Sequence, residues 1–224
     1  MFLKDVFPEE IPTIGAIFYS KVVAKVFQER LERIAEEIEI KEGLILDIGT
    51  GPGFLPVAIA KKEANLRIIG IDISKKMIEI ANRNKRGFTN VEFKVMDANH
   101  LEFEDNTFNM IVSTGSLHHW KTPLKVLNEI YRCLRPGGNA WIYDGYAEAT
   151  LEDLKRGITR KWGIFPPYFL LQKILRIHGF TAQEYQTKIK DLVAKSAFKR
   201  ANFFQMDIYM KIEVEKTLSK ITKN

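Results

Sequence analysis

The chain has 224 residues, of which 46% are hydrophobic and 28% charged, and its formal net charge is +6. A chain of this length can bury one α/β core, and it contains no apolar run of about 18 residues that would cross a membrane. The single cysteine excludes an intramolecular disulfide, and the first residues lack the pattern of a secretory signal, so we expect a cytoplasmic protein.

The first predicted element is a helix over residues 15–38. Its apolar residues recur at helical spacing and form one stripe: Ile17, Phe18, Val22, Val26, Leu31, Ile34 and Ile38. Residues 28–41 (QERLERIAEEIEIK) interleave positive and negative side chains, which is typical of a solvated helix surface. The net positive charge is therefore dispersed, and this pattern argues against a nucleic-acid groove.

Residues 44–53 (LILDIGTGPG) predict a buried strand that runs directly into a glycine-rich turn. The apolar run lacks polar alternation, as expected for a central parallel strand covered on both faces. Gly49, Gly51 and Gly53 remove three side chains at alternate positions, so the backbone can approach a ligand closely. Pro56 falls in the first turn of a following helix, where its missing N–H costs nothing. The segment predicts a site for a nucleoside-containing cofactor.

Two cofactor classes use such a turn. A dinucleotide turn usually has a small residue at the position that Phe54 occupies in this chain. The spacing instead fits D-x-G-x-G-x-G, starting at Asp47, and resembles motif I of the class I methyltransferases that depend on S-adenosylmethionine (SAM). An NAD-dependent oxidoreductase is the disfavoured alternative.

Two further strands each lead to an acidic residue. Residues 67–71 are predicted to form a strand that ends before Asp72, which lies about 20 residues after the glycines, where a carboxylate can bind ribose hydroxyls. Ser74 can cap a helix over residues 75–84 that has Met77 on its apolar face. A strand over residues 91–95 leads to Asp97. Three acidic residues thus follow strands in chain order.

The next segment carries the densest resemblance to a family. A strand over residues 108–113 leads into residues 114–120 (TGSLHHW), and a helix over residues 123–134 contains Cys133, which we expect to be a core residue rather than a nucleophile. Residues 135–138 (RPGG) suit a helix end before a strand over residues 140–143. Residues 40–145 resemble the small-molecule branch of the class I methyltransferases, which includes the enzymes that methylate quinone rings.

The resemblance implies SAM as cofactor and S-adenosylhomocysteine (SAH) as product. It assigns the methionine portion to the glycine turn, the ammonium group to Asp47 directly or through water, the ribose to Asp72 and the adenine amino group to Asp97. The expected cofactor-binding residues are Asp47, Gly49, Thr50, Gly51, Gly53, Asp72, Ile73, Met77, Asp97, Ala98, Ser113 and Tyr19. For Tyr19, simple packing with its hydroxyl at the surface fits equally well.

Residues 150–180 are predicted to form a helical insertion rich in large apolar side chains, for which a substrate lid and an internal core both fit. Residues 165–168 (FPPY) lack the polar first residue of the [DN]-P-P-[YF] signature of base methyltransferases, and a bend between helices explains them more simply. Thr181 and Glu184 suit a capping box for a helix through Ala197. Residues 199–205 and 208–215 read as strands, and their short connection demands an antiparallel hairpin.

Together these elements predict a doubly wound α/β fold. Its sheet is mostly parallel and seven-stranded with a reversed last strand, as the resemblance also implies. We expect one domain over residues 1–224: a helical cap (1–40), a SAM-binding core (41–145), a helical insertion after the fifth strand (150–180), and a last helix with a C-terminal hairpin (181–224).

The predicted function is transfer of the sulfonium methyl of SAM to a small-molecule acceptor by in-line displacement. His118 and His119 follow the fourth strand, and either could act as a general base if the acceptor must lose a proton. We expect no metal, because there is one cysteine and no obvious carboxylate cluster. A catalytically silent SAM-binding protein and an RNA methyltransferase remain alternatives, and the sequence indicates neither the acceptor nor an oligomeric state.

Overall fold

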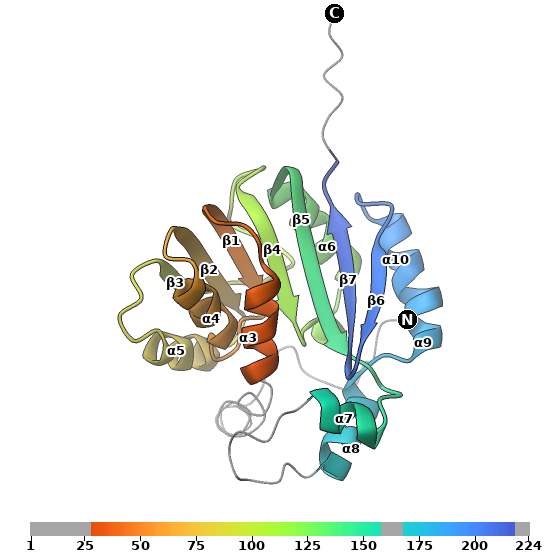
Figure 1. The fold of residues 1–224 in the computed structure, drawn as a ribbon. Helices are drawn as coiled ribbons and strands as arrows, with labels where there is room; N and C mark the ends of the chain where they lie inside the picture. Colours follow the sequence, from red (N-terminus) through yellow and green to blue (C-terminus); the bar gives the residue numbers. More distant parts are fainter. Residues whose placement is uncertain (1–27, 158–167, 218–224) are drawn as a thin grey trace, which may run out of the picture.

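Seven strands form one sheet in the computed structural model, which describes residues 28–157 and 168–217 (Figure 1). The strands are β1 Gly43–Ile48, β2 Leu66–Asp72, β3 Val91–Val95, β4 Phe108–Thr114, β5 Leu134–Gly145, β6 Asn202–Met206 and β7 Tyr209–Glu215. Their order is β3-β2-β1-β4-β5-β7-β6. Neighbours from β3 to β5 pair in parallel, whereas β7 is antiparallel to both β5 and β6. The predicted sheet, with its last strand reversed, is confirmed.

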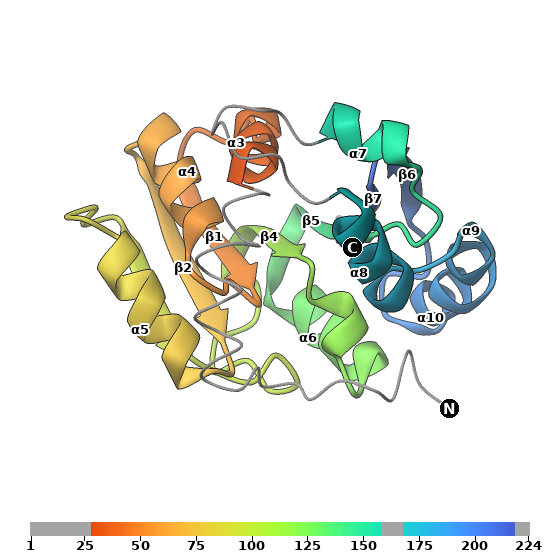
Figure 2. The same cartoon turned by 90° about the horizontal axis from the view of Figure 1, so that it is seen from below.

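Helices cover both faces of this sheet. They are α3 Gln28–Glu37, α4 Phe54–Lys62, α5 Lys75–Asn84, α6 Pro123–Cys133, α7 Leu151–Gly157, α8 Tyr168–His178, α9 Ala182–Glu184 and α10 Lys190–Lys195. Figure 2 shows α3, α4 and α5 on one face and α6, α9 and α10 on the other. In β1, Ile45 packs on the side of α3 and α4, while Leu46 and Ile48 pack on the side of α6. This burial on both faces explains why β1 lacks polar alternation.

The strand β5 is longer than the predicted range of 140–143. Leu134 already pairs with Phe108, and the register then shifts before Asn139 pairs with Met110. The irregular segment between them is held to the end of β7, where the Gly137 N–H donates to the carbonyl of Lys216 at 2.7 Å. The residues predicted to connect α6 to the strand therefore join the sheet through contacts that are remote in the sequence.

The C-terminal part departs from prediction only at element ends. Thr181 and Glu184 form the predicted capping box, with each side chain bonded to the backbone of the other residue. The helix that follows contains a π-helical turn, Tyr185–Ile189, and it ends at Lys195 rather than Ala197. The hairpin is confirmed, but its turn residues are Asp207 and Ile208, and Asp207 has a φ of +46°, which aspartate tolerates.

Helices α7 and α8 lie beyond the carboxyl ends of the parallel strands (Figure 1). Backbone bonds attach this region to β5: the Phe180 N–H donates to the Gly145 carbonyl at 2.8 Å, and the Ala147 N–H donates to the Phe180 carbonyl at 2.9 Å. The predicted helical insertion is confirmed where the structure describes it. Residues 1–27, including Tyr19, and residues 158–167 lie outside the described ranges.

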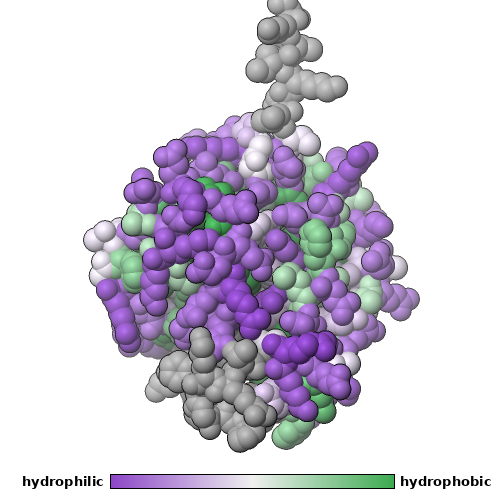
Figure 3. All heavy atoms as spheres, viewed as in Figure 1, coloured by the Kyte–Doolittle hydropathy of each residue, from purple (hydrophilic) through white to green (hydrophobic). Residues whose placement is uncertain are grey.

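The surface around α3 and α4 is predominantly hydrophilic (Figure 3). Its charges are mixed, because Lys41 pairs with Glu63 and Lys62 pairs with Glu36. Lys62 also donates to the carbonyl of Ile38 at 2.8 Å and so stabilises the end of α3. Among the described helices, none has the length and apolar character needed to cross a bilayer.

Candidate cofactor and acceptor site

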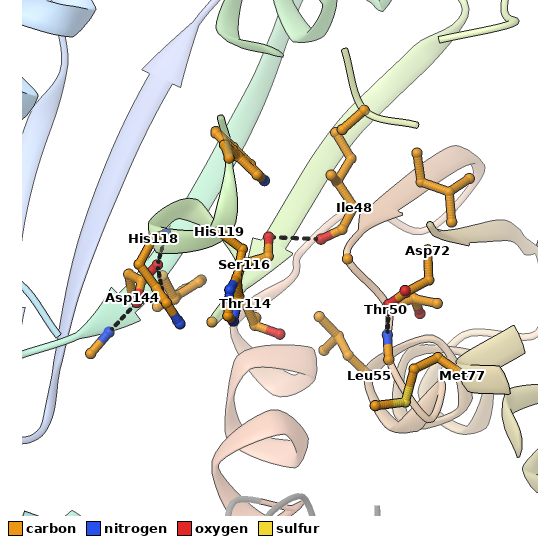
Figure 4. Close-up of a pocket in the computed structure, with 18 of the residues that line it drawn as sticks. Ile48, Thr50, Leu55, Asp72, Met77, Thr114, Ser116, His118, His119 and Asp144 are labelled. Carbon is orange, nitrogen blue, oxygen red and sulfur yellow. Dashed lines mark hydrogen bonds and ion pairs between the residues drawn. The ribbon is translucent and has the colours of Figure 1, made fainter. Parts of the chain in front are cut away.

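A cavity of about 460 Å³ opens at the carboxyl ends of β1, β2, β4 and β5 (Figure 4). Its size is typical of small-molecule sites. The cavity lies where the strand order reverses, because β1 has β2 on one side and β4 on the other. Open α/β sheets bind ligands at such switch points. The walls come from α3, the glycine turn, the start of α5, the segments after β3 and β4, the end of β5, and α8.

The three glycines of the turn have left-handed backbones, with φ values of +70° at Gly49, +52° at Gly51 and +76° at Gly53. A Cβ at Gly51 would meet no atom within 4 Å, and this residue lines the cavity. At Gly53, however, a Cβ would lie 2.4 Å from the ring of Phe93. Gly51 therefore leaves space for a ligand, whereas Gly53 allows the turn to pack on β3.

Asp72 links the turn to the end of β2. Its carboxylate accepts hydrogen bonds from the Gly51 N–H and the Ser74 N–H, each at 2.9 Å. Ser74 caps α5 as predicted by accepting from the Met77 N–H. Ile73, Met77, Asp97 and Ala98 also line the cavity. The structure thus brings the predicted ribose and adenine residues to one side of the site.

Asp47 is buried beside the turn, with 1% of its surface exposed. Its Oδ2 accepts from the Thr50 hydroxyl at 2.7 Å, while its buried Oδ1 has no hydrogen-bond partner among the described residues. Burial raises the pKa of Asp47 to about 7, against the lowering effect of the Thr50 hydrogen bond and with a smaller contribution from the charge of Asp72. An unsatisfied buried carboxylate oxygen is costly unless a donor or a cation approaches it.

Three of the predicted cofactor residues, Asp47, Gly53 and Ser113, do not line the cavity. Ser113 is fully buried, and its hydroxyl donates to the carbonyl of Ile48 at 3.0 Å, so it joins β4 to β1. Its neighbours Thr114 and Ser116 line the cavity instead.

His118 and Asp144 form a pair on the side of the cavity opposite the glycine turn (Figure 4). The Asp144 carboxylate is held by the N–H groups of Gly145 at 2.7 Å and His118 at 3.0 Å. Its Oδ1 lies 2.8 Å from Nδ1 of His118, and both side chains are at least nine-tenths buried. This contact places the proton on Nδ1, so Nε2 of His118 carries the lone pair.

His119 and His178 complete a cluster of three histidines at the same end of the cavity. Burial, followed by the charge of His118, lowers the pKa of His119 to about 4. One nitrogen from each of the three rings lies within 4.8 Å of the others. Asp144 engages only Nδ1 of His118, an arrangement that metal-ligating histidines also show, so the three rings form a candidate metal site that the sequence did not predict.

Sequence reasoning missed Arg30, Asp144 and His178, which all line the cavity. Asp144 follows the rule that identified Asp72 and Asp97, since it is an acidic residue at the end of a strand. Arg30 and His178 reach the site from α3 and α8, and their sequence contexts carry no signal for it. Cys133 is a core residue as predicted, and burial raises its pKa to about 11.

Comparisons with known proteins agree with this geometry. A family model for a methyltransferase domain matches residues 41–165. A demethylmenaquinone methyltransferase of Lactobacillus johnsonii is 24% identical over 79% of this chain and 77% of its own length. The ubiquinone/menaquinone C-methyltransferase UbiE of Desulfotalea psychrophila is 33% identical, over 46% of this chain and 41% of its own.

A solved structure from Methanococcus maripaludis resembles nearly the whole chain. That protein is assigned as a SAM-dependent methyltransferase, and it superposes with a TM-score of 0.72 and 25% identity over 97% of this chain and 98% of its own. The family match covers more than half of the chain, including the glycine turn and every strand from β1 to β5. The chain belongs to the methyltransferase domain family and is a SAM-dependent methyltransferase of the class I fold.

Proposed function

We propose that this protein methylates a small-molecule acceptor bound between the cofactor and His118. The observation that carries the proposal is the division of one cavity into two ends. One end has the glycine turn with Asp72 and Asp97, and the other has the His118–Asp144 pair. A site for SAM beside a site with a positioned histidine is what methyl transfer to an ionisable acceptor requires.

The residues around the turn fit SAM. Gly51 leaves open space at the cavity wall, so backbone can approach the methionine portion closely. Asp47 lies behind the cavity wall, so its buried and unpartnered Oδ1 serves the ammonium group through water rather than by direct contact. Asp72 suits the ribose hydroxyls and Asp97 the adenine amino group, because carboxylates accept hydrogen bonds from both.

The cofactor supplies a methyl group that its sulfonium has already activated for in-line displacement. The chain must therefore hold the acceptor atom in line and exclude water, and such orientation can contribute about 7–11 kcal/mol in favourable cases. Where the acceptor must lose a proton, Nε2 of His118 accepts it while Asp144 keeps the ring in the required tautomer. The charge of the Asp144 carboxylate stabilises the resulting imidazolium.

His118 is a better candidate for the base than His119, although both were predicted. With a pKa of about 4, His119 releases a proton too readily to hold one at neutral pH. His118 is instead bonded to a buried carboxylate at 2.8 Å. We assign proton acceptance to His118 and positioning to Asp144.

The acceptor end has an apolar wall formed by Trp120, Ile174 and Leu175. The names of similar proteins include enzymes that act on demethylmenaquinone, arsenite and phosphoethanolamine. An aromatic or partly apolar small molecule fits a wall of this kind together with a histidine base. The mixed charges around α3 and α4 support a small molecule over RNA.

The test is SAH formation from isotopically labelled SAM with a cell extract as the pool of acceptors. We expect label to appear in a low-molecular-weight product that is resistant to nuclease. Binding of SAM without SAH formation from any extract would indicate a silent SAM-binding protein instead. Label recovered in RNA would indicate an RNA methyltransferase.

A further inference from the structure

Arg30 is a buried charge at the edge of the cavity. It lies in the first turn of α3, lines the cavity and is only 5% exposed. A guanidinium group stays protonated in proteins, so Arg30 cannot avoid the cost of burial by losing its charge. Buried charges of this kind are normally paired with an anion.

Two nitrogens of Arg30 lack a hydrogen-bond partner among the described residues. Nε and Nη2 are both buried and make no hydrogen bond within the described part of the chain. These two atoms form one edge of the guanidinium, and their N–H bonds point in the same direction. This edge matches the two oxygens of a carboxylate, which it can bind through two parallel hydrogen bonds.

Neighbouring carboxylates do not fill this role. Glu29 precedes Arg30, and its own buried Oε1 also makes no hydrogen bond to a described residue. Glu37 lies about two helical turns further along α3. Its carboxylate accepts a hydrogen bond from the Tyr143 hydroxyl at 3.3 Å and lies 3.9 Å from Nζ of Lys211. Within the described residues, neither carboxylate is bonded to Arg30.

Arg30 also lies over an aromatic ring, in a contact that uses none of these donors. Its guanidinium carbon lies 5.5 Å from the centroid of the Tyr209 ring, at the start of β7. A cation above an aromatic face is stabilised by the ring, and this contact leaves the edge of the guanidinium in place for another group. Tyr209 and Arg30 line the same cavity.

We propose that Arg30 is a carboxylate receptor of this cavity, which binds a ligand carboxylate through its Nε and Nη2 edge. The inference rests on the proposed function, because that function supplies two sources of a carboxylate. One is the methionine portion of the cofactor, and the other is an acidic group on the methyl acceptor. Arg30 binds the carboxylate group in the same way from either source.

Calorimetry with two cofactor analogues tests the first source. The probes are SAH and its decarboxylated analogue S-adenosyl-3-thiopropylamine, and the variants are Arg30→Gln and Arg30→Lys. If the cofactor supplies the carboxylate, Arg30→Gln weakens SAH binding at least tenfold and leaves the analogue within threefold. Arg30→Lys then restores part of the affinity, since lysine keeps the charge but loses the paired donors. Arg33→Gln, on the same helix but outside the cavity lining, serves as the matched control.

Benzoate and benzamide, titrated into the SAH-saturated protein, test the second source. If the acceptor supplies the carboxylate, SAH binding is unchanged in Arg30→Gln, while benzoate binds the wild-type complex at least tenfold more tightly than benzamide and loses this preference in the variant. The inference is overturned if the wild-type protein binds SAH and neither SAH nor benzoate binding depends on Arg30. Failure of the wild-type protein to bind SAH would instead overturn the proposed function, and this inference with it.

A stability measurement separates a receptor from a structural residue. Arg30→Met removes an unpaired buried charge, so the melting temperature of the ligand-free protein should stay the same or rise. A structural arginine would give a fall of several degrees, which would overturn the inference.

Discussion

Asp47 lies behind the cavity wall, and its ionisation should respond to the cofactor. At pH 6.5, below its pKa of about 7, the side chain is largely protonated in the free protein. An ammonium group near Oδ1 favours the ionised carboxylate, so SAH binding should release a proton from Asp47. Calorimetry in two buffers of different ionisation enthalpy measures this release. Asp47→Asn should abolish it, and equal proton release by variant and wild type would contradict the assignment.

The His118–Asp144 pair gives the catalytic prediction. We expect His118→Gln to lower the rate of methyl transfer by about 10²- to 10⁴-fold, the usual contribution of a general base. SAH affinity should remain within about twofold, because the histidine lies on the acceptor side. Asp144→Asn should lower the rate while leaving SAH binding intact, since it disturbs the tautomer of His118. Unchanged rates in both variants would show that the acceptor needs no base.

The glycine turn shows what local sequence can and cannot predict. Gly51 and Asp72 were identified because strand, turn and acidic residue follow one another at fixed spacing. That spacing does not tell a glycine that faces a ligand from one that packs against Phe93, as Gly53 does. Arg30 was not predicted from the sequence, because the cavity that it lines is formed by elements that are far apart in the chain.

At the scale of elements, α8 is the wall that the insertion contributes to the site. Leu171 and Leu175 lie on the same helix and are 4% and 6% exposed, but only Leu175 lines the cavity. Core Leu→Ala changes cost about 2–5 kcal/mol, and the cost rises with the new empty volume. We expect Leu171→Ala to fall in this range and Leu175→Ala to cost less, because its side chain already borders open space. Urea denaturation measures both, and a larger loss for Leu175→Ala would contradict this picture.

The elements themselves were largely predictable because their signals are local. The apolar run of β1, the cap at Ser74 and the capping box at Thr181 all depend on residues within a few positions. The start of β5 was not predictable, because Gly137 is held by a hydrogen bond to Lys216. The turn between β6 and β7 was misplaced by one position, because pairing across the hairpin determines it.

At the scale of the whole molecule, two buried groups give opposite contributions to stability as pH changes. The native protein keeps Asp47 protonated up to about pH 7, whereas the ordinary pKa is 3.8, so stability is lost as pH rises across this interval. The native protein keeps His119 neutral down to about pH 4, whereas its ordinary pKa is 6.5, so stability is lost as pH falls across that interval.

Between pH 5 and 6.5 both contributions act, and single variants should separate them. The free energy of unfolding of Asp47→Asn should rise with pH more steeply than that of wild type, by about 1.4 kcal/mol per pH unit. The free energy of unfolding of His119→Gln should rise less steeply than that of wild type, by a similar amount. Denaturation midpoints over this pH range provide the measurement. Slopes equal to wild type in both variants would show that neither group is perturbed by burial.

The topology of the whole sheet, including its reversed strand, was predicted through the family resemblance together with the short hairpin connection. The acceptor was not predictable, because the acceptor end combines α8, the segment after β4 and the end of β5. Their side chains meet only in the folded protein.

Calorimetric titration of SAH into the wild-type protein and Asp72→Ala, with NADH as the competing ligand, shows whether this cavity binds SAM. We expect one SAH site in the wild-type protein, a severe loss of affinity in Asp72→Ala, and no binding of NADH. Binding of NADH without SAH, or SAH binding that is indifferent to Asp72, would contradict the assignment of this cavity to SAM.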